Sequence, residues 1–188
     1  MNKINLIPTP ADYTCSENFI NFEITGARVI GKAEEGLTHA LSLFDKDIEF
    51  SDSGNLVIYI GFENFPEDIK AETEELFGKR FAKEQGYYLA KKSENIVIAA
   101  YDENGAMYAL MTLIQMFYEN TLPESFEIMD SPDFRIRANQ WLLWTEAGMW
   151  SYDRGDGIEK YKERIIRKLD MCLKYKINEI VFDGFCFQ

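Results

Sequence analysis

The chain has 188 residues, of which 46% are hydrophobic and 14% aromatic, so it can bury a core of its own. Its formal net charge of −12 repels phosphate backbones and anionic lipids, and no apolar stretch approaches the ~18 residues of a membrane span. We therefore expect no nucleic acid and no membrane among its partners. The start, up to Pro8, lacks the apolar segment of a secretory leader, which predicts a cytoplasmic protein unless a leader was removed.

Cysteine and histidine are too few for most metal and nucleophilic sites. Cys15, Cys172 and Cys186 are odd in number and widely spaced, which indicates packing thiols rather than a disulfide framework or a zinc site. His39 is the single histidine, so a His-rich site is excluded. We predict no cofactor and no metal.

The residues up to about 130 predict an α+β domain in which strands and helices alternate irregularly. Alternating side chains indicate strands, and apolar residues three or four apart indicate helices. A polar turn at residues 93–95 joins two strands into a hairpin, and the helix after it is apolar nearly all round, as a covered helix is. In chain order we expect strand 19–24, helix 33–44, strand 55–62, helix 66–77, strands 87–91 and 96–101, and helix 105–118.

From residue 131 the pattern changes to strand, helix, strand. A strand over 136–144 leads into a loop rich in glycine and aspartate, and then into a helix for which Asp156 is the expected N-cap. Residues 180–182 form a last apolar strand. Because two strands that flank one helix with a short return must pair in parallel, residues 131–188 predict the opening of an α/β fold. The last strand should be covered on both faces and flanked by strands beyond the end of the chain.

Four stretches of the chain carry a family resemblance. "LIPTPADYTCSENFINF" and "EQGYYLAKKSENIVIAAYDENGAMYALMTLIQM" resemble the accessory domain ahead of the barrel in family 20 glycoside hydrolases, the β-N-acetylhexosaminidases. "DSPDFRIRANQWLL" and "KYKERIIRKLDMCLKYKINEIVF" are similar to that family's first barrel strand, first helix and second strand. The resemblance implies an α+β accessory domain over residues 1–130 and, over residues 131–188, the first βαβ unit of a truncated (β/α)8 barrel. The family's helix pattern is matched by Gly105, Ala106, Tyr108, Leu110, Thr112, Leu113 and Gln115.

The resemblance also implies where chemistry and substrate lie. In such barrels the chemistry is at the carboxyl ends of the strands. The family's Asp–Glu catalytic pair follows the fourth strand, so we expect no catalytic residue in these 188 and no turnover by the chain alone. Arg137 matches the arginine of the family's entry motif, although Ala138 replaces its glycine. Asp183 stands at about the place of a family histidine.

Trp144 and Glu146 complete the predicted substrate-binding set of Arg137, Trp144, Glu146 and Asp183. An indole can stack on a sugar, and a carboxylate at a strand end can accept a hydrogen bond from a hydroxyl. Trp141 is three positions from Trp144, so on a strand one of them faces the barrel mouth and the other the helices. The alternatives are that the tryptophans only pack and that Glu146 is a solvated loop charge.

Together these features predict the amino-terminal part of a glycoside hydrolase. Its full-length parent would hydrolyse terminal β-linked N-acetylhexosamine, or a related glycoside, by substrate-assisted retention. Its partner is then a carbohydrate substrate, and the open edge of the incomplete barrel predicts self-association. Two alternatives stay open: a non-catalytic carbohydrate-binding or scaffold module, and the accessory domain of another carbohydrate hydrolase such as an α-glucuronidase.

Overall fold

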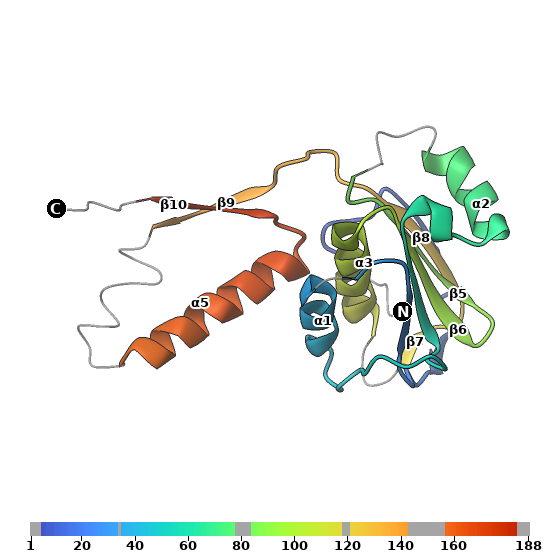
Figure 1. The fold of residues 1–188 in the computed structure, drawn as a ribbon, viewed down its shortest axis with the longest axis horizontal. Helices are drawn as coiled ribbons and strands as arrows, with labels where there is room; N and C mark the ends of the chain where they lie inside the picture. The colour runs from blue at the N-terminus through green and yellow to red at the C-terminus, as the bar shows by residue number, and fades with distance from the viewer. Residues whose placement is uncertain (1–4, 34, 78–83, 118–120, 143–156, 184–188) are drawn as a thin grey trace. The chain divides into compact units, whose positions relative to one another are not determined.

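The computed structural model of the chain describes residues 5–33, 35–77, 84–117, 121–142 and 157–183, and Figure 1 shows its helices and strands. The chain divides into two compact units, each with its own fold: unit 1, Met1–Asp133, and unit 2, Phe134–Gln188. No helix among these described residues is both long and apolar enough to cross a membrane.

Unit 1 is built on a six-stranded mixed sheet. Its strands, in spatial order, are β1 (Asp12–Cys15), β8 (Phe126–Asp130), β5 (Tyr87–Lys92), β6 (Asn95–Ala100), β4 (Leu56–Ile60) and β3 (Ala27–Ile30). The last three run parallel to one another, whereas β5 is antiparallel to both of its neighbours and β1 is antiparallel to β8. A separate antiparallel pair joins β2 (Phe19–Asn21) to β7 (Thr121–Pro123).

Helices cover both faces of the six-stranded sheet (Figure 1). They are α1 (Glu35–Ser42), α2 (Glu67–Phe77) and α3 (Glu103–Met116). Side chains alternate along a strand, so Tyr87 and Tyr88 of β5 point to opposite faces. Tyr87 hydrogen-bonds with Thr112 of α3, against which α1 packs, whereas Tyr88 donates to Glu72 of α2. Hence α1 and α3 lie on one face of the sheet and α2 on the other.

The helix α3 is the centre of the first of these layers. Asp102 caps it, because its two carboxylate oxygens accept from the amides of Gly105 at 2.8 Å and Gln85 at 3.0 Å. At Gly105 an added Cβ would lie 2.5 Å from the carbonyl oxygen of Gly86, so the missing side chain lets the helix approach β5. The prediction of a covered helix is confirmed, since the buried side chains include Ala106, Tyr108, Ala109, Leu110, Met111, Leu113 and Met116.

A buried polar group ties α3 to the sheet. The Tyr87 hydroxyl lies 2.6 Å from Thr112 Oγ1 and donates to Asp130 Oδ2 at 3.2 Å. The other oxygen of Asp130 accepts from the amide of Ala11 at 3.2 Å, which attaches the segment before β1. Burial, and then the negative charge of Asp130, raise the pKa of Tyr87 well above its ordinary value, so the phenol stays neutral.

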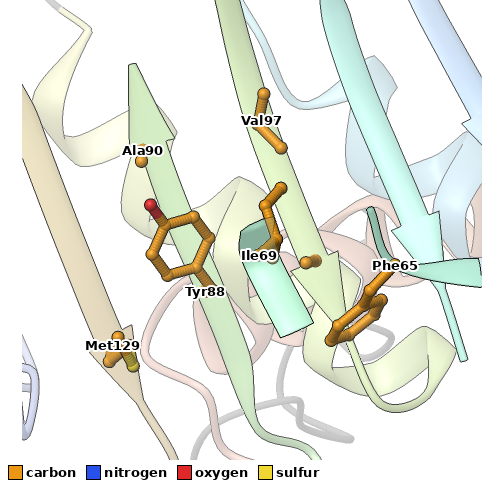
Figure 2. Packing of buried hydrophobic residues seen from close by; sticks show 7 residues of the cluster. Phe65, Ile69, Tyr88, Ala90, Val97 and Met129 are labelled. Carbon is orange, nitrogen blue, oxygen red and sulfur yellow. The ribbon is translucent and has the colours of Figure 1, made fainter. Parts of the chain in front are cut away.

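A smaller core lies between α2 and the sheet, and Figure 2 shows its side chains. Phe65 precedes α2 and Ile69 lies within its first turns; both are 3% exposed. Burying this apolar surface attaches α2 to the sheet, because each buried aliphatic side chain contributes about 1.5–3 kcal/mol. The sheet contributes Tyr88, Ala90, Val97, Ala99 and Met129.

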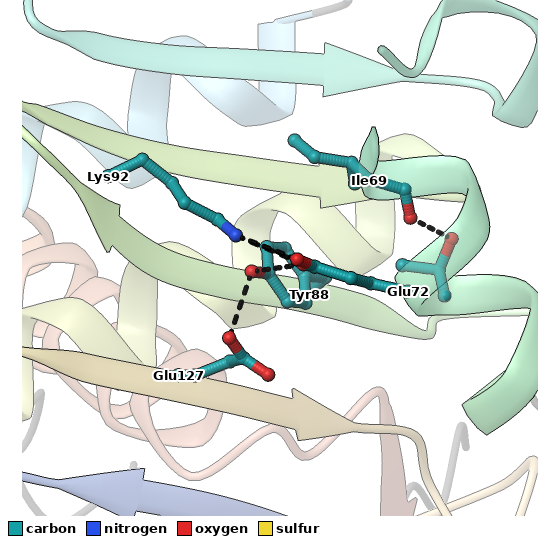
Figure 3. A network of polar contacts seen from close by, with 6 residues as sticks. Ile69, Glu72, Tyr88, Lys92 and Glu127 are labelled. Atoms are coloured by element: carbon teal, nitrogen blue, oxygen red, sulfur yellow. Dashed lines mark hydrogen bonds and ion pairs between the residues drawn. The ribbon is translucent and has the colours of Figure 1, made fainter. Parts of the chain in front are cut away.

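Polar contacts border this smaller core (Figure 3). The Tyr88 hydroxyl donates to Glu72 Oε2 at 2.9 Å and lies 3.3 Å from Glu127 Oε2. Lys92 Nζ contacts the two Glu72 oxygens at 3.0 and 3.1 Å. Burial, and then the hydrogen bond to Glu72, raise the pKa of Tyr88 far above its ordinary value. The phenol is therefore a donor that links α2, β5 and β8.

Most of the predicted elements of unit 1 are present. The helix expected over 66–77 is α2, the hairpin is β5 and β6, and the strand expected over 55–62 is β4. The strand expected over 19–24 is shorter, since β2 ends at Asn21. The sequence did not indicate β1, β3, β7 and β8, which have three to five residues each and pair with segments distant along the chain.

Unit 2 is a parallel βαβ unit. It consists of β9 (Ala138–Leu142), α5 (Gly157–Lys174) and β10 (Glu179–Asp183), and the register runs from Ala138 opposite Glu179 to Leu142 opposite Asp183. The predicted order and parallel pairing are thus confirmed, while the expected N-cap Asp156 lies outside the described residues. Val181 keeps 43% of its surface exposed, so the described residues do not cover β10 on both faces. Its cover by strands beyond the end of the chain stays a prediction.

The close approach at Gly105 predicts a substitution effect opposite to helix propensity. We expect Gly105→Ala to destabilise the protein by about 1–3 kcal/mol, because the Gly86 backbone cannot yield to a Cβ as a side chain would. Gly36→Ala is the matched control: its Cβ would meet the flexible end of Met107, at 2.9 Å from Sδ, and should cost little. Urea unfolding measures both, and equal stabilities would contradict the close approach.

The two buried phenols predict a loss of stability at high pH. Each has a raised pKa in the folded state, so its contribution is fully present below the unfolded pKa of ~10 and is lost as the pH rises towards the folded value. The loss is at most about 1.4 kcal/mol per pH unit for each phenol. Tyr87→Phe and Tyr88→Phe should each flatten this fall. Tyr13→Phe, at an exposed tyrosine of β1, is the control. Identical slopes of stability against pH in the unchanged chain and the three variants would refute the assignment.

Candidate functional site

The predicted substrate residues lie at or near the ends of β9 and β10. Because the strands are parallel, their carboxyl ends meet at one edge, where Asp183 stands in register with Leu142. Trp144 and Glu146 follow β9 in the sequence but lie outside the described residues. The grouping of Trp144, Glu146 and Asp183 at this edge stays a prediction.

Arg137 lies at the opposite, amino end of the strand pair. Its Nε donates to the carbonyl of Lys176 at 2.6 Å, and its Nη1 donates to that of Phe134 at 2.7 Å. The guanidinium thereby ties the segment before β9 to the turn between α5 and β10. The structure does not bring Arg137 together with Asp183, since one precedes β9 and the other ends β10.

Asn178 completes this clamp at the amino end of the strands. Its Oδ1 accepts from the amide of Arg137 at 2.8 Å, and its Nδ2 donates to the carbonyl of Arg135 at 2.8 Å. The sequence marks Asn178 only as a turn residue ahead of a strand. Its contacts join segments about 40 residues apart, a pairing that no local pattern indicates.

The turn that carries Asn178 ends α5 in a Schellman motif. The amide of Ile177 donates to the carbonyl of Cys172, and the amide of Lys176 donates to that of Leu173, both at 2.8 Å. Lys176 has a φ of 59°, in the left-handed region that glycine usually occupies. The carbonyl of Lys176 accepts the hydrogen bond from Arg137 described above, so the guanidinium stabilises this turn.

One face of β9 packs on α5. Trp141 is 2% exposed, and Lys168 Nζ lies 5.6 Å from its ring centroid, as in a cation–π contact. Asn139, two residues earlier and therefore on the same face, contacts Cys172 Sγ at 3.9 Å. Trp141 is thus the tryptophan that faces the helix, which the sequence predicted for one of the pair.

The other face of the strand pair is open. Gln140 alternates with Trp141 and is exposed, and its register partner Val181 is exposed as well. Gln140 was not among the candidate binding residues predicted from the sequence. The available signal was its place next to Trp141, because neighbouring residues of a strand point to opposite faces. Within the segments that the structure describes, no three His, Cys, Asp or Glu side chains come together to hold a metal.

The two units define the class of protein: an α+β domain followed by an α/β unit. A mixed sheet with helices on both faces is followed in the chain by a parallel βαβ unit whose strand ends meet at one edge. The comparison with known families then identifies it: residues 3–131 match the model described as "Glycosyl hydrolase family 20, domain 2", and the chain belongs to this family. The resemblance found in the sequence is confirmed.

Solved structures share the fold. A family 20 exo-β-N-acetylglucosaminidase from Vibrio harveyi, in complex with N-acetylglucosamine, is similar with a TM-score of 0.65 and 20% identity, over 94% of this chain and 25% of that one. A Flavobacterium johnsoniae chitobiase gives 0.61 and 18%, over 95% and 27%. A Bacteroides fragilis β-N-acetylhexosaminidase gives 0.65 and 14%, over 94% and 32%. The chain spans about a quarter to a third of the length of these proteins.

The clamp at the amino end predicts a sensitive position. We expect Arg137→Lys to destabilise unit 2 by about 1–3 kcal/mol, because one ammonium group cannot replace the fork that reaches two carbonyls. Arg167→Lys is the matched control, since that exposed arginine makes one long contact, 3.4 Å to the carbonyl of Glu163. Hydrogen exchange of the β10 amides reports the difference. Equal protection in the two variants would show that the clamp contributes nothing.

Proposed function

We propose that these residues are the amino-terminal part of a glycoside hydrolase that releases terminal β-linked N-acetylhexosamine. The observation that carries the proposal is the family 20 domain over residues 3–131. The names of the similar proteins support it, because they are an exo-β-N-acetylglucosaminidase, a chitobiase and a β-N-acetylhexosaminidase. The activity is proposed for a longer protein that contains this chain, since each of these relatives is three to four times as long.

In this proposal unit 2 is the first βαβ unit of a (β/α)8 barrel. A barrel strand is covered by helices outside and faces the packed interior inside. Trp141 meets α5 on one face, whereas Gln140 and Val181 are exposed on the other, which supports this orientation. The likeness to the solved structures covers at least 94% of the chain, so it extends beyond unit 1 into unit 2.

The proposed substrate contacts are Trp144, Glu146 and Asp183. All three follow or end a strand at the edge where barrels bind substrate. An indole offers a flat apolar surface to the C–H face of a pyranose, and carboxylates accept hydrogen bonds from its hydroxyls. Arg137 is assigned a different role, because its guanidinium already serves two backbone carbonyls at the other end of β9.

No catalytic residue is proposed within this chain. In the substrate-assisted route the acetamido oxygen of the sugar attacks the anomeric carbon as the glycosidic bond breaks. A carboxylic acid protonates the departing oxygen, and water then opens the cyclic intermediate with net retention. The family's Asp–Glu pair for these steps follows the fourth strand of the barrel, so the residues present here position the sugar only.

The proposal predicts a division of activity. We expect the 188-residue chain to show no turnover of an aryl β-N-acetylglucosaminide and the longer protein to hydrolyse it. In the longer protein, Glu146→Gln and Asp183→Asn should each lower kcat/KM by about 10- to 100-fold, because each removes a charged acceptor worth about 1.5–3 kcal/mol.

The control for this assay is Glu159→Gln, whose exposed carboxylate pairs with Lys162 on α5 and should have no effect. A panel of aryl glycosides identifies the sugar, and preference for a glycoside without an N-acetyl group would overturn the proposed substrate. Unchanged kcat/KM in both site variants would show that this edge of unit 2 makes no substrate contact.

A further inference from the structure

The parallel strands of unit 1 send their connections to opposite faces of the sheet. After β3 the chain enters α1, and after β6 it enters α3, both on the face of Tyr87. After β4, which lies between these strands, the chain enters the short 3-10 helix η1 (Phe62–Asn64) and then α2 on the face of Tyr88. In open α/β sheets, ligands bind outside the carboxyl ends of strands at such a divergence.

Aromatic side chains gather at this point. Phe62 follows β4 and Tyr101 follows β6, and their rings are stacked with centroids 5.8 Å apart and planes within 5°. The amide of Gly61 donates to the carbonyl of Ala100 at 2.9 Å, which holds the two strand ends together beneath the rings. Phe65 packs its ring at a steep angle to both, at 5.4 and 5.9 Å. Phe65 is buried, whereas Phe62 and Tyr101 each retain exposed surface.

Polar groups surround these rings. Glu63 follows Phe62 in η1 and is exposed, and its carboxylate lies next to Gly61, where an added Cβ would be 2.5 Å from Oε1. Asn64 donates from Nδ2 to the carbonyl of Ile60 at 2.6 Å, so its side chain is held with its amide group at the end of β4. Burial, and then the negative charge of Glu74, raise the pKa of Tyr101, so its ring carries no charge.

We propose that the exposed surface of Phe62 and Tyr101, with Glu63 next to Phe62 in the chain, is a carbohydrate-binding site of unit 1. A flat aromatic surface packs against the C–H face of a pyranose, and a carboxylate provides an acceptor for its hydroxyls. The negative charge of Glu63 and Glu74 disfavours phosphate or other anionic ligands. The class of sugar, an oligomer of N-acetylglucosamine, rests on the proposed function.

The test is titration calorimetry of the 188-residue chain with the tetramer of N-acetylglucosamine. We expect saturable binding, which Tyr101→Leu weakens by about tenfold or more because the aromatic face is lost. Tyr101→Phe keeps the ring and should bind within about threefold of the unchanged chain. Tyr13→Leu, at an exposed tyrosine on β1, is the control and should bind normally.

A second variant tests the site if the Tyr101→Leu protein fails to fold. Glu63→Gln is exposed, should melt at the same temperature as the unchanged chain, and should weaken binding by about threefold to tenfold. Absence of saturable binding, or an affinity in both Tyr101→Leu and Glu63→Gln equal to that of the unchanged chain, overturns the site. The outcome is distinguishable from that of the proposed function, because it is measured as binding to a chain without turnover. Hydrolysis by the longer protein without such binding would refute this site alone.

Discussion

The contact between α3 and β5 is the constraint on which unit 1 depends. Gly105 allows the two backbones to meet, and Asp102 holds them there by accepting from amides of both the helix and the loop before β5. With α3 in place, two further contacts form on this face. Tyr87 reaches Thr112 of α3, and Glu103 Oε1 accepts from the amide of Leu37 and so caps the start of α1. Removing the approach would break these hydrogen bonds between α3 and its neighbours, each of which contributes about 0.5–1.5 kcal/mol.

Layers on both faces of a sheet also decide where side chains remain available. Buried strands use their backbone groups in the ladder and their side chains in the two cores, so exposed chemistry is left to the carboxyl ends. In unit 1 that edge carries Phe62 and Tyr101, and in unit 2 it carries Asp183. The same physical rule therefore marks both candidate surfaces, although one lies in a mixed sheet and the other in a parallel strand pair.

The side-chain clamp of unit 2 lies at the amino ends of its strands. Arg137 and Asn178 join the amino ends of β9 and β10 through backbone carbonyls and amides, which fixes the register without occupying the other edge. One face of the pair is closed by α5 through Trp141, and the other displays Gln140 and Val181. An exposed face of this kind is what a barrel interior would cover. The proposal that unit 2 opens a barrel is consistent with this exposed face.

The sequence by itself determined the elements whose evidence is local. The periodic apolar residues of α3, the hairpin of β5 and β6, and the βαβ order of unit 2 could be predicted because their signals lie within one segment. Only the tertiary structure decided the short strands β1, β3, β7 and β8, which are strands because of distant partners. It also joined the guanidinium of Arg137 to two backbone carbonyls, and brought Phe62 beside Tyr101. Those pairings depend on which strand ends meet, and hydrogen bonds between segments 40 residues apart leave no periodic trace in the chain.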